Sequence, residues 1–231
     1  MFRLTPRGVE TVLYSFCAQT NCADGANPGA ALIMDEAENL YGTTPVGGAN
    51  DRGTVFELTP GGRETVLYSF CAQTSCVDGS TPLAALIVDK RGNLYGTTAA
   101  GGANNLSFPG GVGTVFELMP NGTETLPYSF CAQTNCTDGA TPTAGLIMDK
   151  AGNLYGTTFH GGGTSGDGTM FELTPGGTET VLYSFCAQTN CADGALPQAG
   201  LIMDKAGNLY GTTVQGGANN FLGGVVFQLT P

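Results

Sequence analysis

Apolar and polar residues alternate in short stretches along this chain, and turn-forming residues end each stretch. Residues 55–59 read Val-Phe-Glu-Leu-Thr, which is the period-two pattern of a strand with one buried face. Pro-Gly-Gly follows and favours a tight turn. Residues 64–70, Glu-Thr-Val-Leu-Tyr-Ser-Phe, are rich in the β-branched and aromatic residues that strands prefer. This pattern predicts two strands joined by a hairpin.

Two further strands are predicted ahead of each such hairpin. Residues 146–149, Leu-Ile-Met-Asp, form a short and nearly continuous apolar run, as expected of a strand buried on both faces. Asp-Lys-Ala-Gly-Asn then turns the chain back into Asn-Leu-Tyr-Gly-Thr-Thr, which is typical of a tight hairpin. In the first copy Glu38 replaces the turn glycine, so we expect strain there if this position has a positive φ.

These four strands form a unit that occurs four times. Tyr-Ser-Phe-Cys begins at positions 14, 68, 128 and 183, and the tyrosine of Asn-Leu-Tyr-Gly-Thr-Thr lies at positions 41, 95, 155 and 210, so both motifs recur at intervals of 54, 60 and 55 residues. Four antiparallel strands with a period near 55 are typical of one blade of a β-propeller. The sequence therefore predicts an all-β fold.

We expect one repeat domain, residues 1–231, that forms a β-propeller of four four-stranded antiparallel blades. The blade units are residues 28–70, 82–130, 142–185, and 197–231 completed by 1–16. Pairing of the N- and C-terminal strands would close the ring and remove exposed sheet edges. However, Phe2–Pro6 and Val225–Pro231 are both candidates for the third strand of the last blade. The alternative is an open array whose ends pair between chains.

Composition and charge narrow the functional classes. The chain has 37 Gly, 12 Pro and only 12% charged residues, which suits many short strands joined by turns. Its net charge of −11 repels phosphate backbones, so a nucleic-acid partner is not expected. No apolar run approaches the roughly 20 residues that span a bilayer. The first residues already belong to a repeat, with no signal peptide ahead of them, so we expect that a leader was removed or that the chain is a fragment.

The cysteines carry the most informative chemistry. All eight occur as Cys-x4-Cys, one pair in the loop after each Tyr-Ser-Phe. This spacing favours four local disulfides and an oxidising compartment, outside the cell or at its surface. Zinc sites, which prefer shorter spacing and four ligands, and reduced buried thiols are the alternatives. The pairs are Cys17/Cys22, Cys71/Cys76, Cys131/Cys136 and Cys186/Cys191.

Loop positions predict a binding surface. In a blade of this strand order, the cysteine loop and the Gly-rich segment between the second and third strands emerge on the same side. Loops on a rigid scaffold commonly carry binding residues, and aromatic and amide side chains can stack on and hydrogen-bond to sugars. These side chains are alternatively ordinary solvated loop residues. The candidates that break the repeat symmetry are Asn104, Asn105, Phe108, Phe159, His160, Asp167, Asn219, Asn220 and Phe221.

Two sets of repeated aspartates have different expected roles. Asp35, Asp89, Asp149 and Asp204 follow the predicted inner strands, where a hydrogen-bonding role in their own turns is expected. Asp24, Asp78, Asp138 and Asp193 precede a glycine in each cysteine loop. If they ring the mouth of a central channel, they are candidate ligands for Ca²⁺, which prefers oxygen ligands.

No catalytic residue is predicted. The common nucleophile-elbow, zinc-protease and phosphate-loop motifs are absent from the sequence. A Ser-His-Asp triad would have to use His160, the single histidine.

The repeat resembles a known family. Pro-x-Ala-Gly-Leu-Ile-x-Asp-x-x-Gly-Asn-Leu-Tyr-Gly-Thr-Thr, a Gly-Gly loop, Gly-Thr-Val-Phe-Glu-Leu-Thr-Pro and Leu-Tyr-Ser-Phe are similar to the Gloeobacter/Verrucomicrobia (GloVer) tandem repeat. The third copy carries this pattern at Pro142, Ala144–Asp149, Gly152–Thr158, Gly168–Pro175 and Leu182–Phe185. The resemblance implies a secreted or surface-anchored bacterial repeat protein, and no biochemical activity is attached to the repeat.

Three functional hypotheses follow from the sequence. The first is an extracellular binding or surface-display propeller that recognises carbohydrate. The second is a secreted propeller hydrolase or lyase, for which Ca²⁺ is the candidate cofactor. The third is a structural protein that self-assembles by strand exchange through the surplus strand.

Overall fold

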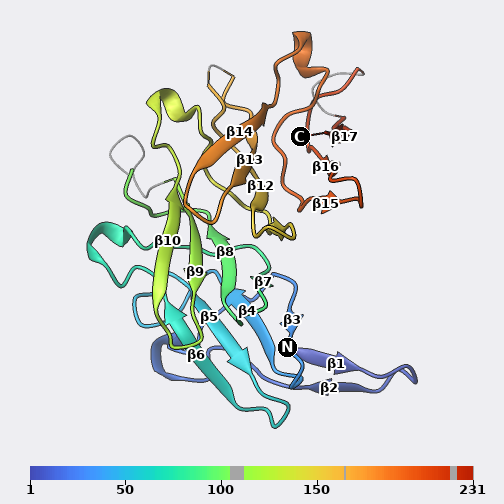
Figure 1. Cartoon of the computed structure of the whole chain (residues 1–231). Coiled ribbons are helices and arrows are strands. Elements are labelled where there is room, and N and C mark those ends of the chain that lie inside the picture. Colours follow the sequence, from blue (N-terminus) through green and yellow to red (C-terminus); the bar gives the residue numbers. More distant parts are fainter. Residues whose placement is uncertain (105–111, 164, 219–222, 231) are drawn as a thin grey trace.

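The fold is all-β, and its sheets follow one another in chain order (Figure 1). The computed structural model describes residues 1–104, 112–163, 165–218 and 223–230. Three antiparallel four-stranded sheets form the body of this part of the chain. They are β3 (Ile33–Met34), β4 (Leu40–Thr44), β5 (Thr54–Leu58) and β6 (Glu64–Ser69); β7 (Ile87–Val88), β8 (Leu94–Thr98), β9 (Thr114–Leu118) and β10 (Glu124–Ser129); and β11 (Ile147–Met148), β12 (Leu154–Thr158), β13 (Thr169–Leu173) and β14 (Glu179–Ser184).

Smaller sheets lie at the two ends of the array. β1 (Phe2–Leu4) pairs with β2 (Glu10–Val12), and β15 (Ile202–Met203), β16 (Leu209–Thr212) and β17 (Val226–Leu229) form a three-stranded sheet. Single 3-10 turns follow β2, β6, β10 and β14. They are η1 (Thr20–Cys22), η2 (Thr74–Cys76), η3 (Thr134–Cys136) and η4 (Thr189–Cys191). No helix among the described residues is long and apolar enough to cross a membrane.

The expected closure of the ring is not formed in this part of the chain. β1 and β2 pair with each other and not with β15–β17, and the two termini lie well apart in Figure 1. The register of this hairpin, Phe2↔Val12, repeats that of the complete first sheet, Phe56↔Val66. β1 has the motif of a third strand and is close to β2 in sequence, so it pairs locally at a small loop-closure cost.

The inner strands differ from the expectation of full burial on both faces. Each has only two residues and pairs with one neighbour, as in Ile87↔Tyr95 and Val88↔Leu94. The preceding leucines Leu86 and Leu146 are buried, whereas Val88 is 45% exposed. The tight aspartate turn begins immediately after the strand and ends the pairing, so only part of the apolar run enters the core.

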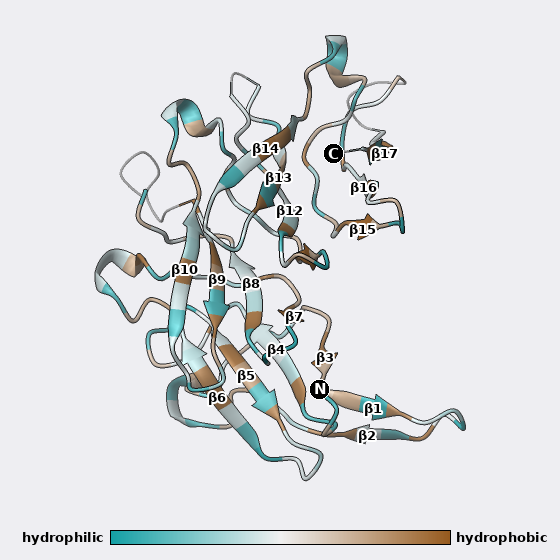
Figure 2. Cartoon of the chain, viewed as in Figure 1, coloured by the Kyte–Doolittle hydropathy of each residue, from teal (hydrophilic) through white to brown (hydrophobic). Residues whose placement is uncertain are grey.

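Neighbouring sheets are joined by pairs of phenylalanines. The phenylalanine after each fourth strand contacts the ring in the third strand of the next sheet, as Phe70 does with Phe116 at a centroid distance of 5.0 Å. Both rings are fully buried. A Cβ on Gly96 would lie 2.6 Å from the Phe116 ring, so glycine is required in the second strand at this point. Figure 2 shows apolar residues along β5, β9 and β13.

A buried aspartate fixes the loop that leads from one sheet to the next. The Tyr68 hydroxyl donates to Asp78 Oδ2 at 2.9 Å, and the backbone N–H groups of Ala72 and Gln73 donate to its two oxygens at 2.8 and 3.2 Å. Asp78 is fully buried. The same contacts recur at Tyr14–Asp24, Tyr128–Asp138 and Tyr183–Asp193.

A glutamate from the following sheet meets three of these Tyr–Asp pairs. Glu64, Glu124 and Glu179 begin the fourth strands, and one carboxylate oxygen of each is buried without a hydrogen-bond partner. Burial, followed by the nearby aspartate charge, raises the pKa of each of these glutamates to about 7. We call each Tyr–Asp–Glu group a carboxyl joint. Its members are Tyr14–Asp24–Glu64, Tyr68–Asp78–Glu124 and Tyr128–Asp138–Glu179.

The aspartates of the tight turns have the predicted structural role. Asp89 Oδ1 accepts from the N–H groups of Arg91 and Asn93 at 2.8 and 2.9 Å, and the other three turns repeat these bonds. Glu38 has a φ of 65°, and the glycine at the same position of the second repeat, Gly92, has 84°. The positive φ on which the expected strain at Glu38 depends is therefore present.

The carboxyl joints predict a loss of stability as pH rises from about 4.5 to 7. The folded pKa of each glutamate lies above the unfolded value of 4.5, so its stabilising contribution is complete below pH 4.5 and is lost as pH rises through about 7. Replacing Glu64, Glu124 and Glu179 with glutamine should flatten this dependence by ~1 kcal/mol per residue, a value reduced for solvent screening of half-exposed groups. Urea unfolding at pH 5 and 7.5 measures the effect. Glu36→Gln, at an exposed position, is the control. The prediction would be contradicted if the free energy of unfolding changed equally between pH 5 and 7.5 in the glutamine variants and in this control.

The first turn gives a second prediction. Glu38→Gly should raise the free energy of unfolding by about 0.5–1 kcal/mol, because glycine adopts the left-handed region without the steric cost of a side chain. Gly92→Ala, at the same position of the second repeat, should lower it. Denaturant unfolding measures the free energy of unfolding of both variants. Changes of the same sign in the two variants would contradict the prediction.

Candidate functional site

The cysteine loops and the Gly-rich loops lie on the same face, as predicted. In the third repeat, Ala140 and His160 exchange two backbone hydrogen bonds of 2.8 and 2.9 Å, and Gly162 N–H donates to Cys136 O at 2.9 Å. Equivalent bridges join Ala26 to Val46, Ser80 to Ala100 and Ala195 to Gln215. Each Gly-rich loop is therefore fixed to a cysteine loop.

All four predicted disulfides are formed. The pairs are Cys17–Cys22, Cys71–Cys76, Cys131–Cys136 and Cys186–Cys191. Zinc ligation and free thiols, the two alternatives, do not describe these residues. Both cysteines of each pair have a positive φ, a conformation that is costly for a residue with a side chain. The covalent link holds this conformation and so keeps the loop in one shape.

The two kinds of loop pack backbone against backbone. A Cβ on Gly161 would lie 2.5 Å from the Gly139 Cα and 2.7 Å from the Cys136 carbonyl oxygen. Only glycine allows this approach. The Gly-Gly pair at the start of each Gly-rich loop thus allows that loop to pack closely against the cysteine loop.

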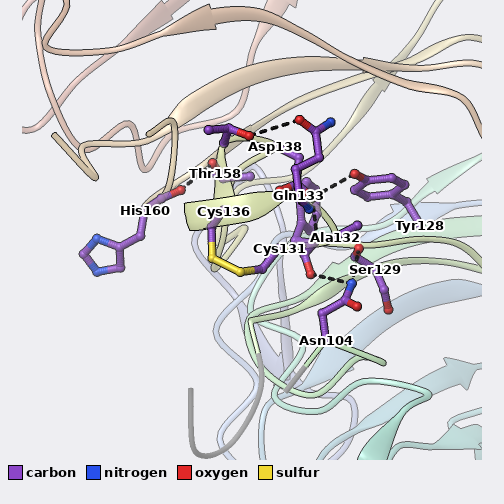
Figure 3. Close-up of a disulfide and its surroundings, with 12 residues drawn as sticks. Asn104, Tyr128, Ser129, Cys131, Ala132, Gln133, Cys136, Asp138, Thr158 and His160 are labelled. Carbon is purple, nitrogen blue, oxygen red and sulfur yellow. Dashed lines mark hydrogen bonds between the residues drawn. A yellow bond between two sulfur atoms is a disulfide. The ribbon is translucent and has the colours of Figure 1, made fainter. Parts of the chain in front are cut away.

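A hollow of about 810 Å³ opens beside the third disulfide loop. Its described lining contains no carboxylate, lysine or arginine. Figure 3 shows the imidazole ring of His160 pointing away from Tyr128 and Asp138. The lining residues are Val112, Cys131, Gln133, Thr134, Asn135, Cys136, Ala140, Thr141, His160, Gly161, Gly163 and Gly166.

Phe159 and His160 form an aromatic pair at this hollow. Their ring centroids are 4.6 Å apart and their planes are inclined by 70°. The Phe159 N–H donates to Thr141 O at 3.0 Å, which fixes the backbone. Phe159 is half-buried and His160 is exposed, so the imidazole is the part of the pair that can meet a ligand.

Asp167 lies beside the fourth disulfide. Burial raises the pKa of its carboxyl group, although the charge of His160 and a hydrogen bond from Ser165 oppose this shift. Its carboxylate and the sulfurs of Cys186 and Cys191 lie within 4.8 Å of one another. Because the two sulfurs are bonded to each other, this group does not offer a set of metal ligands.

Asn104 has a structural contact. Its side-chain amide donates to the carbonyl oxygens of Ser129 and Phe130, both at 3.0 Å (Figure 3). Asn50 makes the corresponding bond to Phe70 O in the first repeat. Asn104 therefore ties its loop to the end of a strand. The remaining predicted binding residues, Asn105, Phe108, Asn219, Asn220 and Phe221, lie outside the described part of the chain.

The loop aspartates do not fit a shared Ca²⁺ site. Asp24, Asp78 and Asp138 have no exposed surface. Asp193 is half-buried, and both oxygens of each of the four accept hydrogen bonds from their own loop. The pKa of Asp24 is lowered: burial acts in the opposite direction, but bonds from Ala18, Tyr14 and Gln19 outweigh it. These carboxylates are occupied by local donors.

Four lining residues were missed by the sequence analysis: Gln133, Thr134, Asn135 and Thr141. Gln133 and Thr134 recur in every copy, and Asn135 and Thr141 recur in some of them, whereas the sequence prediction favoured side chains that break the repeat symmetry. The sequence signal that could have found them lies in the facing loop: a change in the Gly-rich loop alters the surroundings of the repeated cysteine loop that it packs against. His160 occupies the position of Val46, Ala100 and Gln215 in the other bridges.

Comparisons with solved structures support a propeller-like fold. A structural-genomics protein assigned to the gluconolactonases aligns with 100% of this chain and 66% of its own, with a TM-score of 0.53 and 16% identity. A gluconolactonase from Xanthomonas campestris aligns with 85% of this chain and 57% of its own, with a TM-score of 0.52 and 17% identity. PorZ, a surface component of the type-IX secretion system of Porphyromonas gingivalis, aligns over 87% and 24%, with a TM-score of 0.52 and 16% identity. The chain thus spans less than two thirds of each of these structures, and such identities show the fold alone.

Comparison with curated proteins found no match. A family model described as the Gloeobacter/Verrucomicrobia repeat matches residues 108–231, more than half of the sequence. This match confirms the resemblance found in the repeat, and the chain belongs to the Gloeobacter/Verrucomicrobia repeat family.

Proposed function

We propose that the chain is an extracellular binding module that holds a neutral carbohydrate beside its third disulfide loop. The observation that carries this proposal is the neutral hollow of about 810 Å³ between two loops that are fixed to each other. Four disulfides support the extracellular location, because such bonds persist in oxidising compartments.

The chemistry of the lining fits hydroxyl groups. Gln133, Thr134 and Asn135 are exposed and offer both donors and acceptors at the edge of the hollow. His160 adds an aromatic face next to Phe159. A sugar ring presents hydroxyl groups at its edge and C–H groups on its faces, and this combination matches amide, hydroxyl and aromatic partners.

The charge of the protein favours neutral over acidic sugars. The net charge is −11, and a field of this sign repels anionic ligands. Loop rigidity adds to the affinity, because a pre-shaped site loses little conformational entropy on binding.

Carbohydrate binding should depend on His160. We expect His160→Ala to weaken binding of a neutral oligosaccharide selected on a glycan array about tenfold or more, as measured by calorimetry. Gln215→Ala, at the same position of the fourth repeat, is the matched control and should bind like the original chain. Equal affinities in all three proteins, or a preference for uronic-acid glycans, would contradict the proposal.

The same samples test the enzymatic and calcium hypotheses. Binding that is unchanged by EDTA, without glycan cleavage in a product assay, is expected for a simple binding module. Turnover that EDTA abolishes would instead favour the Ca²⁺-dependent hydrolase or lyase.

Self-assembly is the second candidate function, and the open ends of the array favour it. Val226 on β17 is 82% exposed, and Phe2 and Val12 on the β1–β2 hairpin are 64% and 62% exposed. Exposed apolar strand edges favour pairing with another chain. These surfaces lie on the two end sheets.

Size measurement tests self-assembly. By sedimentation velocity at micromolar concentrations, the chain should form species larger than a monomer. Removing Met1–Pro6 should increase their proportion, because β1 covers the edge through which β2 would pair. A monomer in both forms would rule out self-assembly.

A further inference from the structure

The end sheets are complementary in strand order and in side chains. We infer that the open edge of β17 binds β2 of a second copy of this chain, which displaces β1 and completes the fourth sheet. This inference rests on the proposed self-assembly and identifies the surfaces that meet.

The complete sheets provide the geometry of such a pairing. In the first sheet, the third and fourth strands pair as Phe56↔Val66, Glu57↔Thr65 and Leu58↔Glu64. β1 and β2 pair in the same register, with Phe2 opposite Val12 and Leu4 opposite Glu10. β17 carries the same third-strand motif, Val-Phe-Gln-Leu. β2 can therefore exchange β1 for β17 without a change of register.

The fourth Tyr–Asp pair lacks the glutamate of a carboxyl joint. The Tyr183 hydroxyl donates to Asp193 at 2.7 Å, as in the complete joints, but no glutamate is found beside this pair in the described residues. A hollow of about 360 Å³ lies here instead, lined by Tyr183, Phe185, Asp193 and residues 225–229. In the other repeats the fourth strand covers this position.

The missing glutamate is present on β2. Glu10 begins β2 as Glu64, Glu124 and Glu179 begin their own fourth strands, yet Glu10 is exposed. Val12, on the same strand, is 62% exposed, whereas its counterparts Val66, Leu126 and Val181 are half-buried. One end of the chain thus exposes the side chains that the other end lacks.

A second copy fits this role better than the same chain. After β2 the chain continues through Tyr14 and Phe16. Tyr14 donates a hydrogen bond to Asp24 in the loop that leads to the first four-stranded sheet, and the ring of Phe16 packs on Phe56 of that sheet. This anchorage keeps β2 at one end of the array, and the two termini lie apart in Figure 1. Pairing between copies leaves these contacts intact. Because the two surfaces differ, the contact is head-to-tail and can repeat from chain to chain.

Displacing β1 opposes assembly only weakly. The β1–β2 ladder has three residue pairs, and all residues of both strands are exposed. The exchange replaces this ladder with one of the same register in which Val12 and Val226 become covered. Burial of apolar side chains stabilises the exchanged pairing.

Added cysteines test the predicted register. Glu57↔Thr65 in the first sheet corresponds to Gln228 opposite Thr11 of the second copy, and both positions are exposed. A chain with Thr11→Cys is mixed with a chain with Gln228→Cys under mild oxidation. Non-reducing electrophoresis should show a cross-linked dimer at least fivefold more abundant than when either variant is oxidised alone. Thr11→Cys mixed with Lys150→Cys, at an exposed turn outside this surface, is the matched control.

The outcomes separate the inference from the self-assembly on which it rests. If sedimentation showed larger species but the Thr11–Gln228 dimer were no more abundant than the control dimer, the pairing of β17 with β2 would be overturned. The proposed self-assembly would still hold. A monomer throughout would overturn both. If a chain carrying both cysteines gave only an internally bridged monomer, the second copy would be excluded in favour of closure within one chain.

A charged substitution gives an independent readout. Val12→Lys should shift the midpoint of assembly to at least tenfold higher concentration, because it places an ammonium group where the pairing covers an apolar side chain. Val9→Lys introduces the same charge at the exposed residue that precedes β2 and should leave the midpoint unchanged. Equal midpoints for the two variants would overturn the inference.

Discussion

The hydrogen bonds to the aspartate of each cysteine loop are the interaction on which the rest of the structure depends. A buried carboxyl group is costly unless it is hydrogen-bonded, and here a tyrosine hydroxyl and two backbone N–H groups donate to it. The tyrosine belongs to the strand before the loop, so these bonds set the path by which the chain leaves one sheet and enters the next. Repetition of this contact accounts for the regular succession of the sheets.

The same contact determines where variable residues are displayed. With the aspartate inside the loop and the disulfide holding its shape, the Gly-rich loop packs against it through backbone atoms. Side chains such as His160 then face outward and can differ between repeats without disturbing the scaffold. In the third repeat this framework borders the hollow beside His160, which is the physical basis for placing a ligand there.

The glutamates show how neighbouring sheets depend on one another. Each buries a carboxyl oxygen without a partner next to an aspartate that is bonded to its own loop, and burial followed by the aspartate charge raises the pKa of the glutamate. A repeat is complete only when the following sheet provides this group, and an end of the array is left with an unmatched surface. This dependence on nearest neighbours is characteristic of repeat proteins.

The sequence alone determined the strands, the disulfide pairs and the common face of the two loops, because these follow from local patterns: period-two alternation, turn residues and cysteines five positions apart. It did not reveal the role of Glu64 and its counterparts, which resemble ordinary strand residues until the preceding loop packs beside them. Nor could it decide how the ends pair, since Phe2–Leu4 and Val226–Leu229 carry the same motif. Only the tertiary structure distinguishes these two strands, because pairing depends on which edge lies within reach, and β1 lies next to β2 whereas β17 is at the opposite end of the array.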